Sequence, residues 1–181
     1  MKGIVFTEFL EMVESQFSLE LSEQILQASD LPSGGIYTSV GTYDHQEISQ
    51  LVGHLSQLTG ISVPVLLNTY GQHLLKRFAE GYPQFFDGIH STFEFLEQID
   101  GYIHEEVKKL YPDAELPRFT YHYPAPNQLE MTYYSTRHLE DLAEGLIQGA
   151  IHHFAEKMTL SRRKGAEEGH SVTHFLLTKQ G

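Results

Sequence analysis

The chain has 181 residues, 40% of them hydrophobic and 12% aromatic, which is enough for one domain with a sizeable core, or for two subdomains that share one. Its formal net charge of −12 argues against a nucleic-acid or anionic-membrane binder, since either needs a basic face, and it favours a partner with a basic surface. The lack of cysteine excludes disulfides and thiolate metal sites, and no targeting segment or run of transmembrane length is present, so we expect a cytoplasmic protein.

The first 110 residues predict a series of helices. Apolar side chains recur at helical spacing in several segments, and breaks that contain Gly or Pro separate most of these segments. The expected helices cover residues 4–17, 20–29, 44–60, 62–81 and 91–110. The side chains expected to cap them are Thr42 or Asp44, Ser62, and Ser91 or Thr92.

Beyond residue 117 the hydrophobic period changes. Strands are expected at residues 118–123, 129–134, 159–163 and 174–178, with a long helix over residues 139–158. The glycine-bounded stretch from Gly165 to Gly169 predicts that the last two strands form a hairpin. The order predicts an α+β fold within one domain, residues 1–181. An N-terminal helical subdomain (1–62) packs on a C-terminal subdomain (63–181) of helices and a four-stranded antiparallel sheet.

Three donors alternate at the end of the second expected strand. Tyr133, Ser135 and Arg137 share one face if this segment is extended, with Leu129 and Met131 before them on the same face. A guanidinium flanked by two hydroxyls suits a carboxylate or a phosphate, because arginine donates two parallel hydrogen bonds. The spacing therefore predicts an anion cradle.

His104 lies at the margin of the apolar stripe of the helix expected over residues 91–110. Gly101 precedes it by one turn on the same side of that helix. A glycine there leaves the helix surface bare beside an imidazole, which would let a large flat group approach the backbone.

These features together resemble the haem nitric oxide/oxygen binding (H-NOX) family over nearly the whole chain, as do the Met-Lys-Gly start and the Leu-Pro-Arg string at residues 116–118. The resemblance implies a haem b between the two subdomains, with His104 as the ligand to iron. It also implies that Tyr133, Ser135 and Arg137 hold the haem propionates and that Pro117 presses on the porphyrin and bends it. Protohaem suits the residues independently, since it offers two carboxylates, a flat apolar face and an iron that one histidine can ligate.

The resemblance also implies an apolar distal wall. Some relatives that hold oxygen stably place a tyrosine there, at the position of Leu142. Other relatives carry a cysteine-containing zinc site near the C-terminal hairpin, which this chain without cysteine cannot form. The residues implied for the distal wall are Val5 or Ile4, Phe9, Leu74, Phe78, Leu142 and Leu146.

The function implied is a nitric oxide sensor with no reaction of its own, a stand-alone bacterial relative of the haem domain of soluble guanylate cyclase. It would also bind carbon monoxide. Because no catalytic domain follows within the 181 residues, we expect its output to pass through a partner, in bacterial relatives typically a histidine kinase or a cyclic-di-GMP enzyme. Two alternatives remain: a haem enzyme such as a peroxidase, for which His73 is the nearest distal acid or base, and a haem-free pocket for an anionic metabolite.

Overall fold

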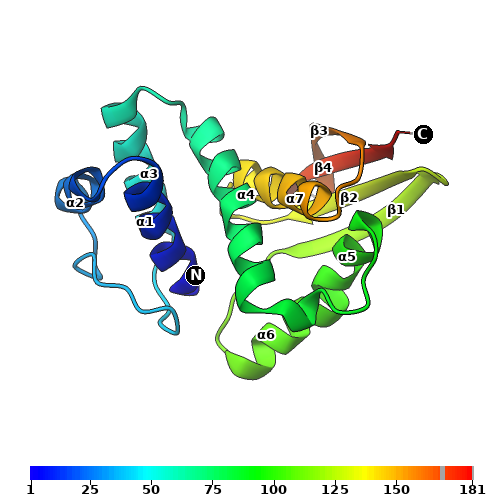
Figure 1. Cartoon of the computed structure of the whole chain (residues 1–181), viewed down its shortest axis with the longest axis horizontal. Helices are drawn as coiled ribbons and strands as arrows, with labels where there is room; N and C mark the ends of the chain where they lie inside the picture. Colours follow the sequence, from blue (N-terminus) through cyan, green and yellow to red (C-terminus); the bar gives the residue numbers. More distant parts are fainter. Residues whose placement is uncertain (168–169, 181) are drawn as a thin grey trace.

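The computed structural model describes residues 1–167 and 170–180 (Figure 1). Helices α1 (Ile4–Gln16), α2 (Leu19–Ala28) and α3 (His45–Thr59) lie together at one side of the molecule, close to their predicted bounds. The Asp44 carboxylate accepts a hydrogen bond from the backbone at the start of α3, and Gly60, with φ of 74°, ends this helix. Both ends of α3 are predictable from the sequence, because aspartate is preferred just before a helix and glycine just after one.

Helices α4 (Val63–Gly81) and α7 (Glu140–His153) lie side by side in the middle of the molecule (Figure 1). Glycines allow this closeness. A Cβ at Gly71 of α4 would overlap the backbone of α7, and a Cβ at Gly145 of α7 would overlap the backbone of α4. The two helices therefore pack with their backbones in direct contact at these glycines.

The prediction that one helix runs over residues 139–158 is wrong at its C-terminal end. Helix α7 ends at His153, and Ala155 then takes the left-handed conformation with φ of 51°. The Glu156 N–H donates to the Ile151 carbonyl at 3.2 Å and the Ala155 N–H donates to the His152 carbonyl at 3.1 Å. These two bonds are a Schellman motif, which usually carries glycine where this chain has alanine, so no glycine marks the end of the helix.

The helix predicted over residues 91–110 is interrupted. Ser91 caps α5 (Thr92–Gln98), the π-helical turn η2 (Ile99–Ile103) follows, and α6 (His104–Leu110) completes the segment. A π turn inserts an extra residue into a helix and shifts every later side chain around the axis. Between α4 and α5 the chain forms the short 3₁₀ helix η1 (Pro83–Phe85).

The four-stranded antiparallel sheet is confirmed, in the order β1-β2-β4-β3. Strands β3 and β4 pair directly as predicted, and Gly165 is a paired residue of β3, whereas Gly169 lies outside the described residues. The strands are β1 (Arg118–Ala125), β2 (Gln128–Tyr134), β3 (Met158–Glu167) and β4 (His170–Lys179).

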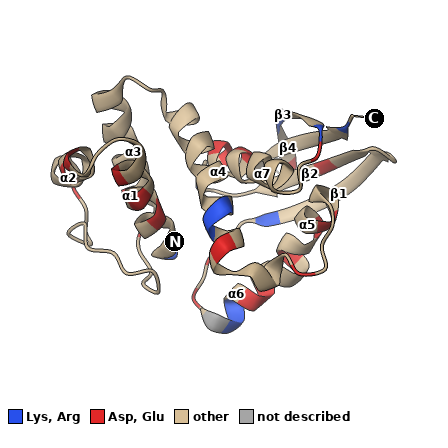
Figure 2. Cartoon of the chain, viewed as in Figure 1, with Lys and Arg blue, Asp and Glu red and all other residues tan. Residues whose placement is uncertain are grey.

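The buried side chains form two apolar clusters. The first joins α1, α3 and α4, and the second fills the space between the sheet and helices α5 and α7. Leu146 of α7 packs against both clusters. Acidic residues lie along α1 and α2 (Figure 2), and two of those on α1, Glu8 and Glu11, bind Arg77 of α4. Within the described ranges, no helix is both long enough and apolar enough to cross a bilayer.

Candidate functional site

His104 begins α6, and its side chain is 16% exposed. Its Nδ1 lies 3.0 Å from Oδ1 of Asp100, and its Nε2 takes part in no hydrogen bond with the described residues. Burial lowers the pKa of His104, although Asp100 opposes the shift. The neutral ring is therefore favoured near pH 7, which is the form of histidine that binds a metal.

The anion cradle differs from the prediction in its backbone. Strand β2 ends at Tyr134, and the Arg137 N–H donates to Ser135 Oγ at 3.1 Å, so residues 135–137 bend instead of continuing the strand. Serine favours such local bonds to its own backbone over a strand ladder. Consequently Tyr133, Ser135 and Arg137 lie near one another in the chain but do not share one strand face.

The three cradle side chains have different surroundings. Tyr133 is buried, and burial raises its pKa while a hydrogen bond with Ser135 opposes the rise. The Arg137 guanidinium binds the exposed Glu115 carboxylate at 2.6 Å. A pocket of about 120 Å³ opens beside Tyr133 and Ser135. Its other lining residues are His138, Glu140, Lys164, Ser171, Val172 and Thr173.

The side chains expected in the distal wall come together in the first apolar cluster. Phe9, Leu74 and Leu142 are buried in it. Val5, Phe78 and Leu146 are partly buried and pack against it. Between the two alternatives at the N-terminus, Val5 contacts this cluster, whereas Ile4 lines a separate cleft of about 780 Å³ between α1 and the end of α4.

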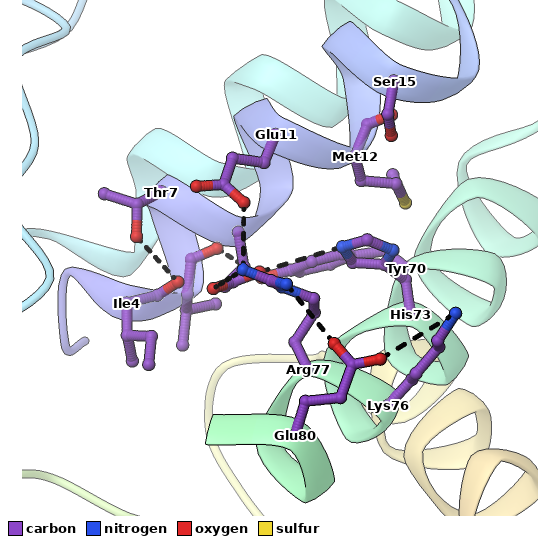
Figure 3. Close-up of polar contacts among 12 residues, drawn as sticks. Ile4, Thr7, Glu11, Met12, Ser15, Tyr70, His73, Lys76, Arg77 and Glu80 are labelled. Carbon is purple, nitrogen blue, oxygen red and sulfur yellow. Dashed lines mark hydrogen bonds and ion pairs between the residues drawn. The ribbon is translucent and has the colours of Figure 1, made fainter. Parts of the chain in front are cut away.

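The polar residues near this cluster are turned to other partners (Figure 3). The buried Tyr70 hydroxyl donates to the Val5 carbonyl. His73 places Nε2 3.8 Å from a carboxylate oxygen of Glu8, on the side of α4 where Arg77 also binds Glu8 at 2.7 Å. These contacts place His73 beside Glu8 and Arg77, on the side of α4 that faces α1.

Pro117 is half-buried at the end of the loop that leads into β1. Asp113 of the same loop contacts the N-terminal part of the chain. Its carboxylate accepts a hydrogen bond from Thr42 Oγ1 at 2.6 Å and lies 3.6 Å from Lys2 Nζ. Thus the segment that carries Pro117 is fastened to the N-terminal part by exposed polar contacts.

The family model and the solved structures that resemble this chain point to one family. The family model described as haem-NO-binding matches residues 2–162. The chain belongs to the haem-NO-binding family. Its members are haem-based gas sensors, which are sensor modules and not enzymes. Curated proteins give no significant match.

Solved H-NOX structures share the fold of the whole chain. An unliganded Fe(II) H-NOX protein from K. algicida is 39% identical, with a TM-score of 0.91 over 100% of this chain and 97% of that chain. An H-NOX protein from S. oneidensis in the Fe(II)NO state is 27% identical, with a TM-score of 0.91 over 100% of both chains. The IWP-051-bound H-NOX from Shewanella woodyi in the Fe(II)CO state is 39% identical, with a TM-score of 0.84 over 99% of this chain and 95% of that chain.

The residues of this H-NOX chain fit a haem. His104 keeps one ring nitrogen free of described partners, and a Cβ at Gly101 would meet no atom within 4 Å, so the helix surface beside the imidazole is open. Tyr133, Ser135 and Arg137 supply hydroxyl and guanidinium donors for carboxylates. Sequence reasoning missed Asp100, although an acidic residue four positions before a candidate ligand is a readable signal.

Proposed function

We propose that this chain is a haem b sensor of nitric oxide that also binds carbon monoxide and regulates a separate signalling protein. The observation that carries the proposal is His104, a half-buried imidazole whose Nδ1 is held by Asp100 while Nε2 has no described hydrogen bond. Such an arrangement is typical of a histidine that ligates a metal through its second nitrogen. When bound, the haem iron supplies the coordination site for the gas.

The chain's own residues have separate roles in this proposal. His104 would ligate the iron, and Tyr133, Ser135 and Arg137 would bind the propionates. Arg137 would exchange its exposed partner Glu115 for a propionate, which costs little because an exposed ion pair contributes only about 0–1 kcal/mol. Pro117, in the loop before β1, would contact the porphyrin.

The distal wall selects the gas. Leu142, Leu74 and Phe78 offer no hydrogen-bond donor, and Tyr70 already donates to a backbone carbonyl. Bound oxygen needs a donor more than nitric oxide or carbon monoxide does, so the wall favours the latter two. The H-NOX relatives from S. oneidensis and Shewanella woodyi were solved in Fe(II)NO and Fe(II)CO states, which supports nitric oxide and carbon monoxide as ligands of this chain.

We place two subdomains at residues 1–62 and 63–181, and the proposed switch is a movement of the helix that carries His104 relative to the distal helices. If gas binding released His104 from the iron, the α5–α6 segment could move relative to α1 and α4. The protein would then have two states with different surfaces. Exposed polar contacts such as those of Asp113 with Lys2 and Thr42 can exchange at low cost during such a movement. The first apolar cluster spans the boundary between the two subdomains, since it holds Leu66, Leu74 and Leu142 together with residues of α1 and α3.

The partner in this proposal is a cytoplasmic histidine kinase or cyclic-di-GMP enzyme. The acidic residues along α1 and α2, with the net charge of −12, favour a basic surface on that partner (Figure 2). The test adds the protein to each enzyme class with and without nitric oxide. A gas-dependent change in enzyme rate supports the proposal, and equal rates in both states contradict it.

Absorption spectra test the haem and gas assignments. Protein purified after haem supply should show a Soret band that shifts on addition of nitric oxide or carbon monoxide to the ferrous form. A chain without a Soret band would favour the haem-free pocket for an anionic metabolite, and rapid peroxide turnover would favour the peroxidase alternative.

His104→Gly tests the iron ligand. The variant should lose the histidine-ligated ferrous spectrum, and added imidazole should restore it, because His104 is expected to supply the nitrogen. His153→Gly, at the exposed end of α7, is the control and should keep the wild-type spectrum. An unchanged spectrum for His104→Gly would show that another residue ligates the iron.

A further inference from the structure

Asp100 lies in the π turn that precedes the candidate iron ligand. The turn η2 (Ile99–Ile103) separates α5 from α6 and ends directly before His104. Such turns are rare in proteins as a whole, and many of those that occur lie at functional sites. Here the turn brings the Asp100 and His104 side chains together, with Oδ1 and Nδ1 3.0 Å apart.

Both oxygens of the Asp100 carboxylate are engaged. Oδ1 lies against His104 Nδ1, and Oδ2 accepts from the backbone N–H of Phe119 in β1 at 3.1 Å. A carboxylate can accept at both oxygens at once. An asparagine would present an NH₂ group to one of these two N–H groups, so the isosteric amide cannot make both bonds.

The contact fixes the tautomer of the imidazole. Since an ionised carboxylate only accepts hydrogen bonds, the proton of neutral His104 must lie on Nδ1, which leaves the lone pair on Nε2. Carboxylate partners of this kind orient metal-ligating histidines and raise their basicity. The described contacts of His104 supply no competing partner for Nδ1.

Asp100 also joins the ligand helix to the sheet. Phe119, whose N–H it binds, places its ring 6.0 Å from the His104 ring and 5.5 Å from the Tyr133 ring. One strand residue therefore contacts the candidate ligand and a member of the propionate cradle. A displacement of His104 would strain the Asp100 bond to β1 directly.

We propose that Asp100 is the positioning residue of this haem site: it holds His104 in the Nδ1-protonated tautomer, strengthens its bond to iron, and ties the ligand helix to β1 through the Phe119 N–H. This inference rests on the proposed function, because it presumes that His104 ligates the iron. It deepens that function by assigning the group that sets the strength of the iron–histidine bond.

Resonance Raman spectroscopy of the ferrous, unligated haem protein tests the proposal. In Asp100→Asn the iron–histidine stretching band should shift to lower wavenumber, because the imidazole loses its carboxylate partner. In Asp100→Glu, which keeps a carboxylate, the band should lie between the Asp100→Asn and wild-type positions. Glu105→Gln is the matched control, since it removes an exposed carboxylate directly beside His104, and it should leave the band in place.

The outcomes separate the two proposals. If the wild-type protein has no iron–histidine band, the ligand assignment of His104 fails and this inference falls with it. If the wild-type band is present but Asp100→Asn leaves it unmoved, the role of Asp100 alone is overturned. Should Asp100→Asn fail to fold, proton NMR of the wild-type ferrous protein decides. A resolved, slowly exchanging Nδ1 proton on His104 supports the bond, and one that exchanges as fast as an exposed imidazole proton overturns it.

Discussion

Gly145 of α7 lies directly against Asn68 of α4, so that a Cβ at position 145 would overlap the Asn68 carbonyl oxygen. Gly71 makes the reciprocal approach to the backbone of α7 near Leu142 and Leu146. Because these two leucines belong to the proposed distal wall, the glycine contacts set the distance between the two helices that form it. Stability and pocket shape therefore depend on the same pair of glycines.

Gly145→Ala should lower the free energy of unfolding by about 1–3 kcal/mol, the usual cost of overpacking, because the added Cβ would meet the rigid backbone of Asn68. Gly53→Ala is the matched control in the middle of α3, where a Cβ meets no atom within 4 Å. It should raise stability by about 0.5–1 kcal/mol, since alanine loses less backbone entropy in a helix. Denaturant unfolding measures both, and equal effects of the two variants would contradict the close approach.

Much of the fold was predictable because local signals agreed with the tertiary structure. Asp44 and Ser91 cap the helices they were expected to cap, and the alternation of Leu129, Met131 and Tyr133 gave the buried face of β2. The end of α7 was missed because Ala155 occupies a position where glycine is the usual signal. Local pattern cannot report a left-handed residue that only the surrounding contacts hold in place.

The candidate site was predictable in composition and less so in geometry. The spacing of Tyr133, Ser135 and Arg137 identified the donors, but not the bend that follows Tyr134. The π turn before His104 was also missed, since the apolar spacing around it fits an unbroken α-helix. Its cause is tertiary, because Asp100 binds a backbone N–H of β1 that lies 19 residues further along the chain.

Arg137→Ala should weaken haem retention. The variant leaves a propionate without a charge-assisted hydrogen bond worth about 1.5–3 kcal/mol, which corresponds to roughly 10- to 150-fold faster haem loss. Transfer of haem to an excess of apomyoglobin measures the rate. Glu115→Gln is the control, because it removes the exposed partner of Arg137 and should change haem loss little. Equal rates for Arg137→Ala and the wild type would refute the cradle.

Tyr70→Phe should lower the free energy of unfolding by about 0.5–1.5 kcal/mol, the net worth of one neutral hydrogen bond. The buried hydroxyl donates to the Val5 carbonyl, so its loss removes a bond between α4 and α1. The carbon monoxide and nitric oxide spectra should stay unchanged, because this hydroxyl is not free to reach a bound gas. A shift of either spectrum in Tyr70→Phe would identify Tyr70 as a distal donor.

The last prediction concerns oxygen. Oxygen bound to iron carries negative charge and is held longer by a distal donor, and Leu142, Leu74 and Phe78 provide none. A charge-assisted hydrogen bond is worth about 1.5–3 kcal/mol, so its absence weakens oxygen binding by roughly 10- to 150-fold. The ferrous protein in air should therefore show no stable oxygen complex while it binds nitric oxide and carbon monoxide.

Leu142→Tyr tests the cause of that selectivity by placing a hydroxyl in the distal wall. It should increase oxygen affinity and leave carbon monoxide affinity nearly unchanged, because the donor favours the more charged complex. Leu142→Phe is the control for ring size without the hydroxyl and should gain no oxygen affinity. Gas titrations of the three ferrous proteins give the comparison. A persistent oxygen complex in the wild-type protein would mean that a donor enters the pocket. His73 would then be the first residue to replace, because its Nε2, although 3.8 Å from Glu8, makes no hydrogen bond with the described residues.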